Sequence, residues 1–204
     1  MDKPVIALTF DDGPNTTITV QILDILEKHD AVATFFVKGC NITPETTKVM
    51  QRAVALGCEI ANHTENHPNL THLGIDDVKK EVASATKKIF EAIGQKPKIF
   101  RSPYIAENDE IYAAVPLTFI DGYHVADYDS NNDVAFRVDR ALSQAHDGAV
   151  LIMHDFEGNH QTVEALEIII HALKEQEYGF VTAGELIDLK KPESLKFINN
   201  LHLW

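Results

Sequence analysis

Cysteine is scarce in this sequence, which has only two, Cys40 and Cys58, among 204 residues. They do not form a C-x-x-C pair, and a disulfide framework needs more cysteines than this. We expect both to be free thiols. Long apolar runs are also missing: no stretch of about eighteen apolar residues occurs, so the sequence predicts no membrane-spanning helix.

Basic residues are outnumbered, because 18 Lys and Arg stand against 31 Asp and Glu, which gives a net charge of -13. An acidic surface disfavours nucleic acid and anionic membranes as partners, but it is compatible with neutral polysaccharides. No internal repeat, low-complexity segment or linker is present. We therefore expect one catalytic domain over residues 1–204, and a monomer.

A signal peptide is absent as well, since residues 1–4 lead directly into the first apolar stretch. A mature domain cut from a longer secreted precursor looks the same. We expect a secreted protein, with the cytoplasm as the alternative. The final stretch, residues 190–204, mixes charged and apolar side chains and either packs on the domain or joins it to another module.

What the sequence does contain is a regular alternation of about seven apolar strands with amphipathic helices. Parallel sheets with helical crossovers have this pattern, and we expect an α/β fold with a closed or nearly closed parallel barrel. The expected strands are 5–8, 31–37, 58–61, 98–100, 117–122, 149–153 and 180–182. The expected helices are 18–29, 44–57, 76–93, 109–114, 132–145, 161–176 and 183–189.

Polar side chains follow five of these strands, at Asp11-Asp12, His63, Arg101, Asp127 and His154. Ligands bind at the carboxyl ends of the strands in folds of this class, so these side chains are expected to share one rim. Several loops that bring polar residues to one place favour an enzyme.

The adjacent carboxylates of Asp11 and Asp12 point in different directions at the end of a strand and can take different roles. His63 and His67 are spaced i and i+4, so one short helical turn, ended by Pro68, places both imidazoles on one side. Two histidines and one carboxylate form a facial metal site for Zn, Co, Fe, Ni or Mn.

Two further residues have the chemistry of catalytic groups. His154 titrates near neutral pH and is a candidate general acid; viewed alone, it is equally a polar residue that finishes a strand. Arg101 is a candidate partner for a carboxylate on the rim, or else part of a phosphate site or a surface ion pair.

Taken in order, residues 9–14 (TFDDGP), 63–67 (HTENH), 101–104 (RSPY), 127–128 (DY) and 151–155 (LIMHD) resemble the five motifs of the polysaccharide deacetylases. This family, carbohydrate esterase family four with its NodB-homology domain, has a distorted (β/α) barrel and depends on a metal. The motifs span most of the chain, and the surrounding sequence is most similar to the acetylxylan-esterase branch.

The resemblance implies a role for each motif residue. Asp11 would be the catalytic base, oriented by Arg101, and Asp12 would bind one divalent metal, Zn or Co first, with His63 and His67. His154 would be the general acid, tuned by Asp127. The substrate would contact Pro103, the backbone amide of Tyr104, the ring of Tyr128 and, around the acetyl methyl group, the side chain of Leu151.

Two positions depart from the family pattern: Tyr128 stands where the family has Trp, and Ile105 where it has Gly. The implied substrate is an acetylated polysaccharide or oligosaccharide, with acetylxylan first. The alternatives are chitooligosaccharide or peptidoglycan N-deacetylation, a non-glycan amidase on the same scaffold, and an inactive carbohydrate-binding relative. No Gly-x-Ser-x-Gly elbow is present, which fits hydrolysis without a covalent serine intermediate.

Overall fold

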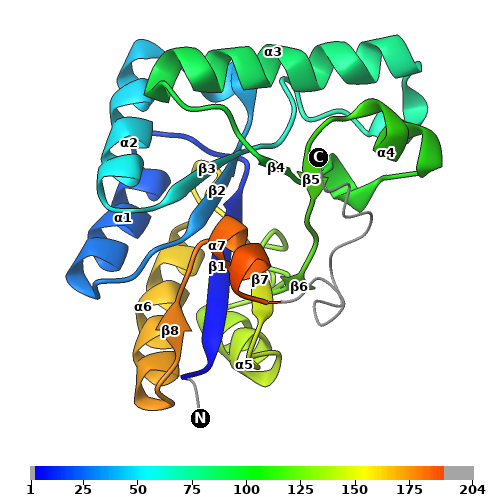
Figure 1. Cartoon of the computed structure of the whole chain (residues 1–204). Coiled ribbons are helices and arrows are strands. Elements are labelled where there is room, and N and C mark those ends of the chain that lie inside the picture. The colour runs from blue at the N-terminus through cyan, green and yellow to red at the C-terminus, as the bar shows by residue number, and fades with distance from the viewer. Residues whose placement is uncertain (1–2, 191–204) are drawn as a thin grey trace.

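A computed structural model describes residues 3–190 and has a curled parallel sheet at its centre (Figure 1). Within the described residues all strand pairs are parallel, and the strand order is β5-β4-β3-β2-β1-β7-β6, with β8 pairing with the start of β1. The strands are β1 (Val5–Asp11), β2 (Thr34–Val37), β3 (Glu59–Asn62), β4 (Ile99–Phe100), β5 (Thr118–Phe119), β6 (Tyr123–His124), β7 (Ala149–His154) and β8 (Gly179–Phe180). The expected distorted (β/α) barrel is confirmed.

Helices α1 to α6 lie on the outer face of this sheet, as right-handed crossovers between parallel strands require. The helices are α1 (Ile18–Lys28), α2 (Pro44–Ala55), α3 (Ile75–Ile93), α4 (Asp109–Ala114), α5 (Val134–Ser143), α6 (His160–Glu175) and α7 (Ala183–Leu189), with 3-10 turns η1 (Gly39–Asn41), η2 (Leu70–His72) and η3 (Pro103–Ile105). The expected helix positions are therefore recovered, with ends that shift by a few residues.

The barrel interior is closed at one end by α7 in Figure 1. Ala183 and Leu186 of this helix are fully buried and pack in one cluster with inward side chains of the strands, namely Ala7, Phe36, Ala61, Ile99, Ile120 and Val150. The Ala183 amide donates to Thr34 Oγ1 at the start of β2. Helix α7 therefore covers the amino ends of the strands and leaves their carboxyl ends for the site.

The strand expected over 117–122 is shorter, because β5 covers only Thr118–Phe119, and a separate short strand, β6, follows Gly122 at Tyr123. A Cβ at Gly122 would lie 2.5 Å from the carbonyl oxygen of Val150, so only glycine allows this close approach to β7. Within residues 3–190, β5 and β6 are the two edge strands and do not pair with each other, so the barrel is open there.

The cysteines and the helix lengths agree with the sequence predictions. Cys40 is exposed, Cys58 is buried, and both are free thiols, as predicted. No helix between residues 3 and 190 has the length and apolarity that a bilayer crossing requires. The expectation for the C-terminal stretch concerns residues outside the described range, apart from Lys190.

Candidate active site and metal centre

The carboxyl end of β1 carries the two adjacent aspartates. Asp11 is the last residue of the strand and is 4% exposed, while Asp12 follows it with a left-handed backbone (φ 82°). Non-glycine residues rarely adopt this conformation, and such strain clusters at functional sites. The turn separates the two carboxylates, so that each meets a different set of partners.

His63 and His67 follow strand β3. Their segment is an irregular loop and not the expected helical turn, with φ of 69° at Thr64 and 59° at His67. The loop nevertheless brings the rings of His63 and His67 to a centroid distance of 4.9 Å. The expectation of a shared face is therefore confirmed, but the expected helical geometry is wrong.

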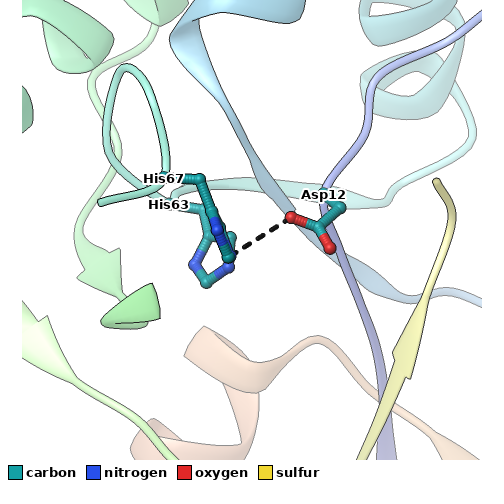
Figure 2. A group of neighbouring side chains, drawn as sticks. All are labelled: Asp12, His63 and His67. Atoms are coloured by element: carbon teal, nitrogen blue, oxygen red, sulfur yellow. Dashed lines mark ion pairs between the residues drawn. The ribbon is translucent and has the colours of Figure 1, made fainter. Parts of the chain in front are cut away.

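Asp12, His63 and His67 together form a possible metal site. One ligand atom from each residue lies within 4.8 Å of the other two, and Figure 2 shows both imidazoles directed at the carboxylate. Asp12 Oδ1 is buried and accepts no hydrogen bond from any described residue, although Lys38 Nζ and His67 Nε2 each lie 3.4 Å away. An acceptor left in this state fits a cation.

The protonation of the three side chains also suits a metal. His63 Nδ1 lies 2.7 Å from the carbonyl oxygen of Arg101, which can only accept, so Nδ1 carries the proton and Nε2 keeps a free lone pair. Burial lowers the pKa of His63 to about 4 and also lowers that of His67. Burial opposes ionisation of Asp12, but His63, Lys38 and His67 outweigh it and lower the pKa of this carboxyl.

Asp11 is held by the fully buried guanidinium of Arg101. Arg101 Nη1 donates to Asp11 Oδ1 at 2.7 Å and to Thr9 Oγ1 at 2.8 Å, and Nε donates to the carbonyl oxygen of Ile120 at 3.1 Å. The guanidinium carbon lies 4.1 Å from the centroid of the Phe36 ring. These contacts fix the orientation of Asp11 and exclude the surface ion pair considered for Arg101.

His154 ends β7, beside Asp11 in the sheet register, and pairs with Asp127. Its Nδ1 lies 2.7 Å from Asp127 Oδ1, which leaves Nε2 as the nitrogen that can give a proton to a bound molecule. Burial alone would lower the pKa of the imidazole, but the hydrogen bond and charge of Asp127 outweigh it and raise the pKa to about 9.

Aromatic residues border this arrangement. Tyr104 is 69% exposed and its ring packs edge-on against His67 at 4.7 Å, while Tyr128 is 61% exposed and packs edge-on against His154 at 5.8 Å. Pro103 is buried and opens the 3-10 turn η3 that carries Tyr104. At position 128 an aromatic ring therefore lies beside the His154 imidazole, although the residue is Tyr and not Trp.

Leu151 does not lie at the site, and its expected contact with substrate is wrong. Its side chain is fully buried and belongs to the cluster that includes Leu8 of β1 and Leu166 of α6. Side chains alternate along β7, so Ile152 and not Leu151 shares a face with His154.

Two residues of the site were not predicted. Lys38, directly after β2, lies 3.4 Å from Asp12. Asp155 is fully buried, donates its amide to the Asp11 carbonyl at 3.0 Å and accepts from Thr19 Oγ1 at 2.5 Å. A Cβ at Gly13 would lie 2.2 Å from Asp155 Oδ2, so glycine is required there. The proximity of Lys38 and Asp155 to predicted strand ends was the available signal.

An open groove of about 700 Å³ begins at Asp12. Its lining is mostly polar or charged, with a proline and an aromatic ring: Pro14, Asn15, Thr16, Lys38, Cys40, Asn41, Thr43, Glu45, Thr46, Phe156 and Glu157. The site is therefore open to this groove at Asp12 and Lys38.

Residues 1–129 match the family model described as polysaccharide deacetylase. A bifunctional xylanase/deacetylase of Pseudobutyrivibrio xylanivorans is 42% identical over 189 residues, which are 93% of this chain and 31% of the relative. The peptidoglycan-N-acetylmuramic acid deacetylase PdaC of Bacillus subtilis is 37% identical over 199 residues, which are 96% of this chain and 41% of the relative. The chain thus spans less than half the length of these curated relatives.

Among solved structures, a family 4 acetyl xylan esterase from Clostridium thermocellum in complex with a cobalt ion is similar throughout. Its TM-score to this chain is 0.90 at 33% identity, and the match covers 98% of this chain and 100% of that one.

Proposed function

The chain belongs to the polysaccharide deacetylase family, and from this we propose that it is a metal-dependent esterase that removes O-acetyl groups from acetylxylan. The observation that carries the proposal is the convergence of three units at one sheet edge. These are the Asp12-His63-His67 triad, the Asp11-Arg101 pair and the Asp127-His154 pair.

Asp12, His63 and His67 would hold the metal, which is Zn or Co in this proposal. A divalent ion bound there supplies Lewis acidity toward an acetyl carbonyl and toward a water molecule. Both imidazoles are neutral at neutral pH and the carboxylate is ionised, so no ligand has to lose a proton before binding. The cobalt ion of the related esterase supports this choice of metal.

Asp11 is the proposed general base, because its carboxylate lies beside the metal ligands without being one of them. Arg101 fixes Oδ1 of this carboxylate and thereby directs the group toward the water that attacks the acetyl carbonyl. The backbone amide of Tyr104 is the proposed hydrogen-bond donor to the developing oxyanion. The proposed base thus ends β1, and the proposed oxyanion donor lies in η3, after β4.

His154 is the proposed general acid. Its raised pKa keeps the imidazole protonated at neutral pH, so that Nε2 can give a proton to the departing sugar oxygen. Asp127 on Nδ1 fixes the ring and stabilises its charged form. Acid and base are then separate groups, and no covalent enzyme intermediate is needed.

The proposed substrate is a glycan because the site is open. A groove that starts at Asp12, together with the exposed rings of Tyr104 and Tyr128, suits a sugar chain, whereas a small amide favours a closed pocket. Acetylxylan is preferred because the relatives include a xylanase/deacetylase and an acetyl xylan esterase. The second candidate is peptidoglycan N-deacetylation, which the similarity to PdaC favours.

Acetate release measured in parallel from acetylated xylan, chitooligosaccharide and peptidoglycan tests the proposal. Each assay is run with chelator-treated protein and again after addition of Zn or Co. Metal-dependent release from xylan, at a rate well above the other two, is expected. Preferential release from an N-acetylated substrate would overturn the xylan assignment, and release from none of them would overturn the glycan assignment. A secreted location also remains a proposal.

A further inference from the structure

The carboxylate of Asp127 is held from two sides. Oδ1 accepts from His154 Nδ1, as described above, whereas Oδ2 faces the start of helix α6. Oδ2 accepts from the backbone amide of His154 at 2.8 Å, from Thr162 Oγ1 at 2.7 Å and from Asn159 Nδ2 at 3.2 Å. Asp127 is 1% exposed, so these protein donors replace water. The donors on Oδ2 include two side chains that the reaction described above does not use.

Behind those two side chains lies Arg137 of α5, which is 2% exposed. Its Nη1 donates to Asn159 Oδ1 at 2.6 Å and to Thr162 Oγ1 at 2.8 Å, and its Nε donates to the Asn132 carbonyl oxygen at 2.9 Å. All of these acceptors are neutral, and no ion pair within residues 3–190 includes Arg137. Burying a guanidinium is costly without a nearby anion. The Asp127 carboxylate, which Asn159 and Thr162 contact on their other side, supplies that negative charge.

Arg137 fixes the direction of both hydrogen bonds to Asp127. A guanidinium can only donate, so Thr162 Oγ1 accepts from Arg137 and turns its own hydrogen toward Asp127. By the same logic the oxygen of the Asn159 amide faces Arg137 and its NH₂ group faces Asp127 and the His154 carbonyl. Thr162 and Asn159 can therefore form all of these hydrogen bonds in one side-chain orientation only.

The Asn159 side chain does not cap helix α6, although it stands at the position where it could. It is the N-cap residue of α6, where a side-chain oxygen usually accepts from the helix, yet it makes no side-chain capping bond. Omitting such a cap destabilises a helix. The side-chain amide forms hydrogen bonds with Arg137, Asp127 and the His154 carbonyl instead. This indicates a role at the site and not in the helix.

We propose that Arg137, through Thr162 and Asn159, positions Asp127 so that the His154 imidazole is aligned for proton donation. None of the three touches the reacting atoms, and all are positioning residues. The inference rests on the proposed function, because it takes His154 to be the general acid. We call Arg137, Asn159 and Thr162 the Asp127 support.

Thr162 allows the sharpest test. Thr162→Val keeps the shape and removes the hydroxyl, whereas Thr162→Ser keeps the hydroxyl. We expect Thr162→Val to lower kcat for acetate release from acetylated xylan about tenfold or more with KM unchanged, and Thr162→Ser to restore most of it. Arg137→Gln, which leaves Thr162 and Asn159 free to turn, is the second variant and should lower kcat at least as much.

The matched control is Thr34→Val. Thr34 is also fully buried and its hydroxyl also donates to a carboxylate, Glu59 Oε2 at 3.0 Å, but it lies at the amino end of β2, away from the site. Thermal unfolding of all variants measures the common cost of a lost buried hydrogen bond. We expect Thr34→Val to leave kcat unchanged.

A second readout needs no substrate. NMR of the His154 Nδ1–H proton reports its hydrogen bond to Asp127, and this signal should shift or broaden in Thr162→Val and return in Thr162→Ser. If the wild-type protein releases no acetate but the signal responds in this way, the proposed function fails and the support stands. An unchanged signal in Thr162→Val, unchanged kcat, or equal impairment of the Ser and Val variants would overturn the inference.

Discussion

His154 Nδ1 and Asp127 Oδ1 lie 2.7 Å apart, although 27 residues separate them in the chain. Their contact links the end of β7 to the loop after β6 and leaves Nε2 of the imidazole for the substrate. The Asp11-Arg101 pair forms the corresponding unit nearer the centre of the sheet. The proposed proton donor and the proposed proton acceptor thus end neighbouring strands, β7 and β1, and each is held by a partner of its own.

The His154-Asp127 pair predicts the alkaline side of the pH profile. A general acid acts in its protonated form, and the pKa of His154 is raised to about 9, so kcat/KM should fall as pH rises through about 9. Asp127→Asn removes the charge that opposes burial, so the fall should move to lower pH. An alkaline limb that stays in place in this variant would contradict the assignment.

Replacement of the proposed base separates chemistry from metal binding. Asp11→Asn keeps an oxygen for Arg101 and leaves the triad intact, so metal content should be unchanged while kcat falls about a hundredfold or more. Metal analysis and acetate release are measured on the same preparation. Asp77→Asn, a change at an exposed carboxylate on α3, is the control. Near-full activity of Asp11→Asn would exclude the proposed base.

Buried Asp155 predicts how stability depends on pH. Burial raises its pKa to about 7, while in an unfolded chain the pKa of an aspartate lies near its ordinary value of 3.8. The folded state therefore binds the proton more tightly, and this residue costs stability progressively as pH rises from about 4 to 7, on the order of 4 kcal/mol in total. Asp155→Asn does not titrate.

Urea unfolding of wild type and Asp155→Asn at several pH values isolates this effect, because other titrating groups cancel in the difference. The free energy of unfolding of the variant should gain on that of the wild type between pH 4 and 7 and then stay parallel. A constant difference over this range would show that Asp155 is ionised in the folded protein.

Ile105 has a left-handed backbone, with φ of 52°. A side chain in this conformation costs about 1 kcal/mol relative to glycine. Ile105→Gly should therefore be more stable than Ile105→Ala by about 1 kcal/mol in urea unfolding, a comparison in which both variants lose the side-chain packing. An Ala variant of equal stability would contradict the strain.

Much of the site follows from the sequence because parallel strands end at one sheet edge. Apolar runs identify the strands, and the polar residues just after them, from Asp11 to His154, must then meet. Local backbone geometry was not predictable in this way. The left-handed residues Thr64 and His67 bring two imidazoles together without the helical turn that their spacing suggested.

Side-chain direction and distant partners were the other gaps. Leu151 was placed in the pocket from its motif, although strand alternation turns it into the core beside Leu8. Arg137 has no local signal, because its partners Asn159 and Thr162 lie 22 and 25 residues away on another helix. Only the packing of α5 against α6 reveals that contact.

Metal dependence is the central claim, and a metal titration tests it most directly. Chelator-treated protein is titrated with Zn or Co while acetate release from acetylated xylan is followed, in wild type and in His63→Ala. The account predicts no release without metal, full recovery near one equivalent in the wild type, and no recovery in the variant. Release that survives chelation, or recovery in His63→Ala equal to the wild type, would contradict it.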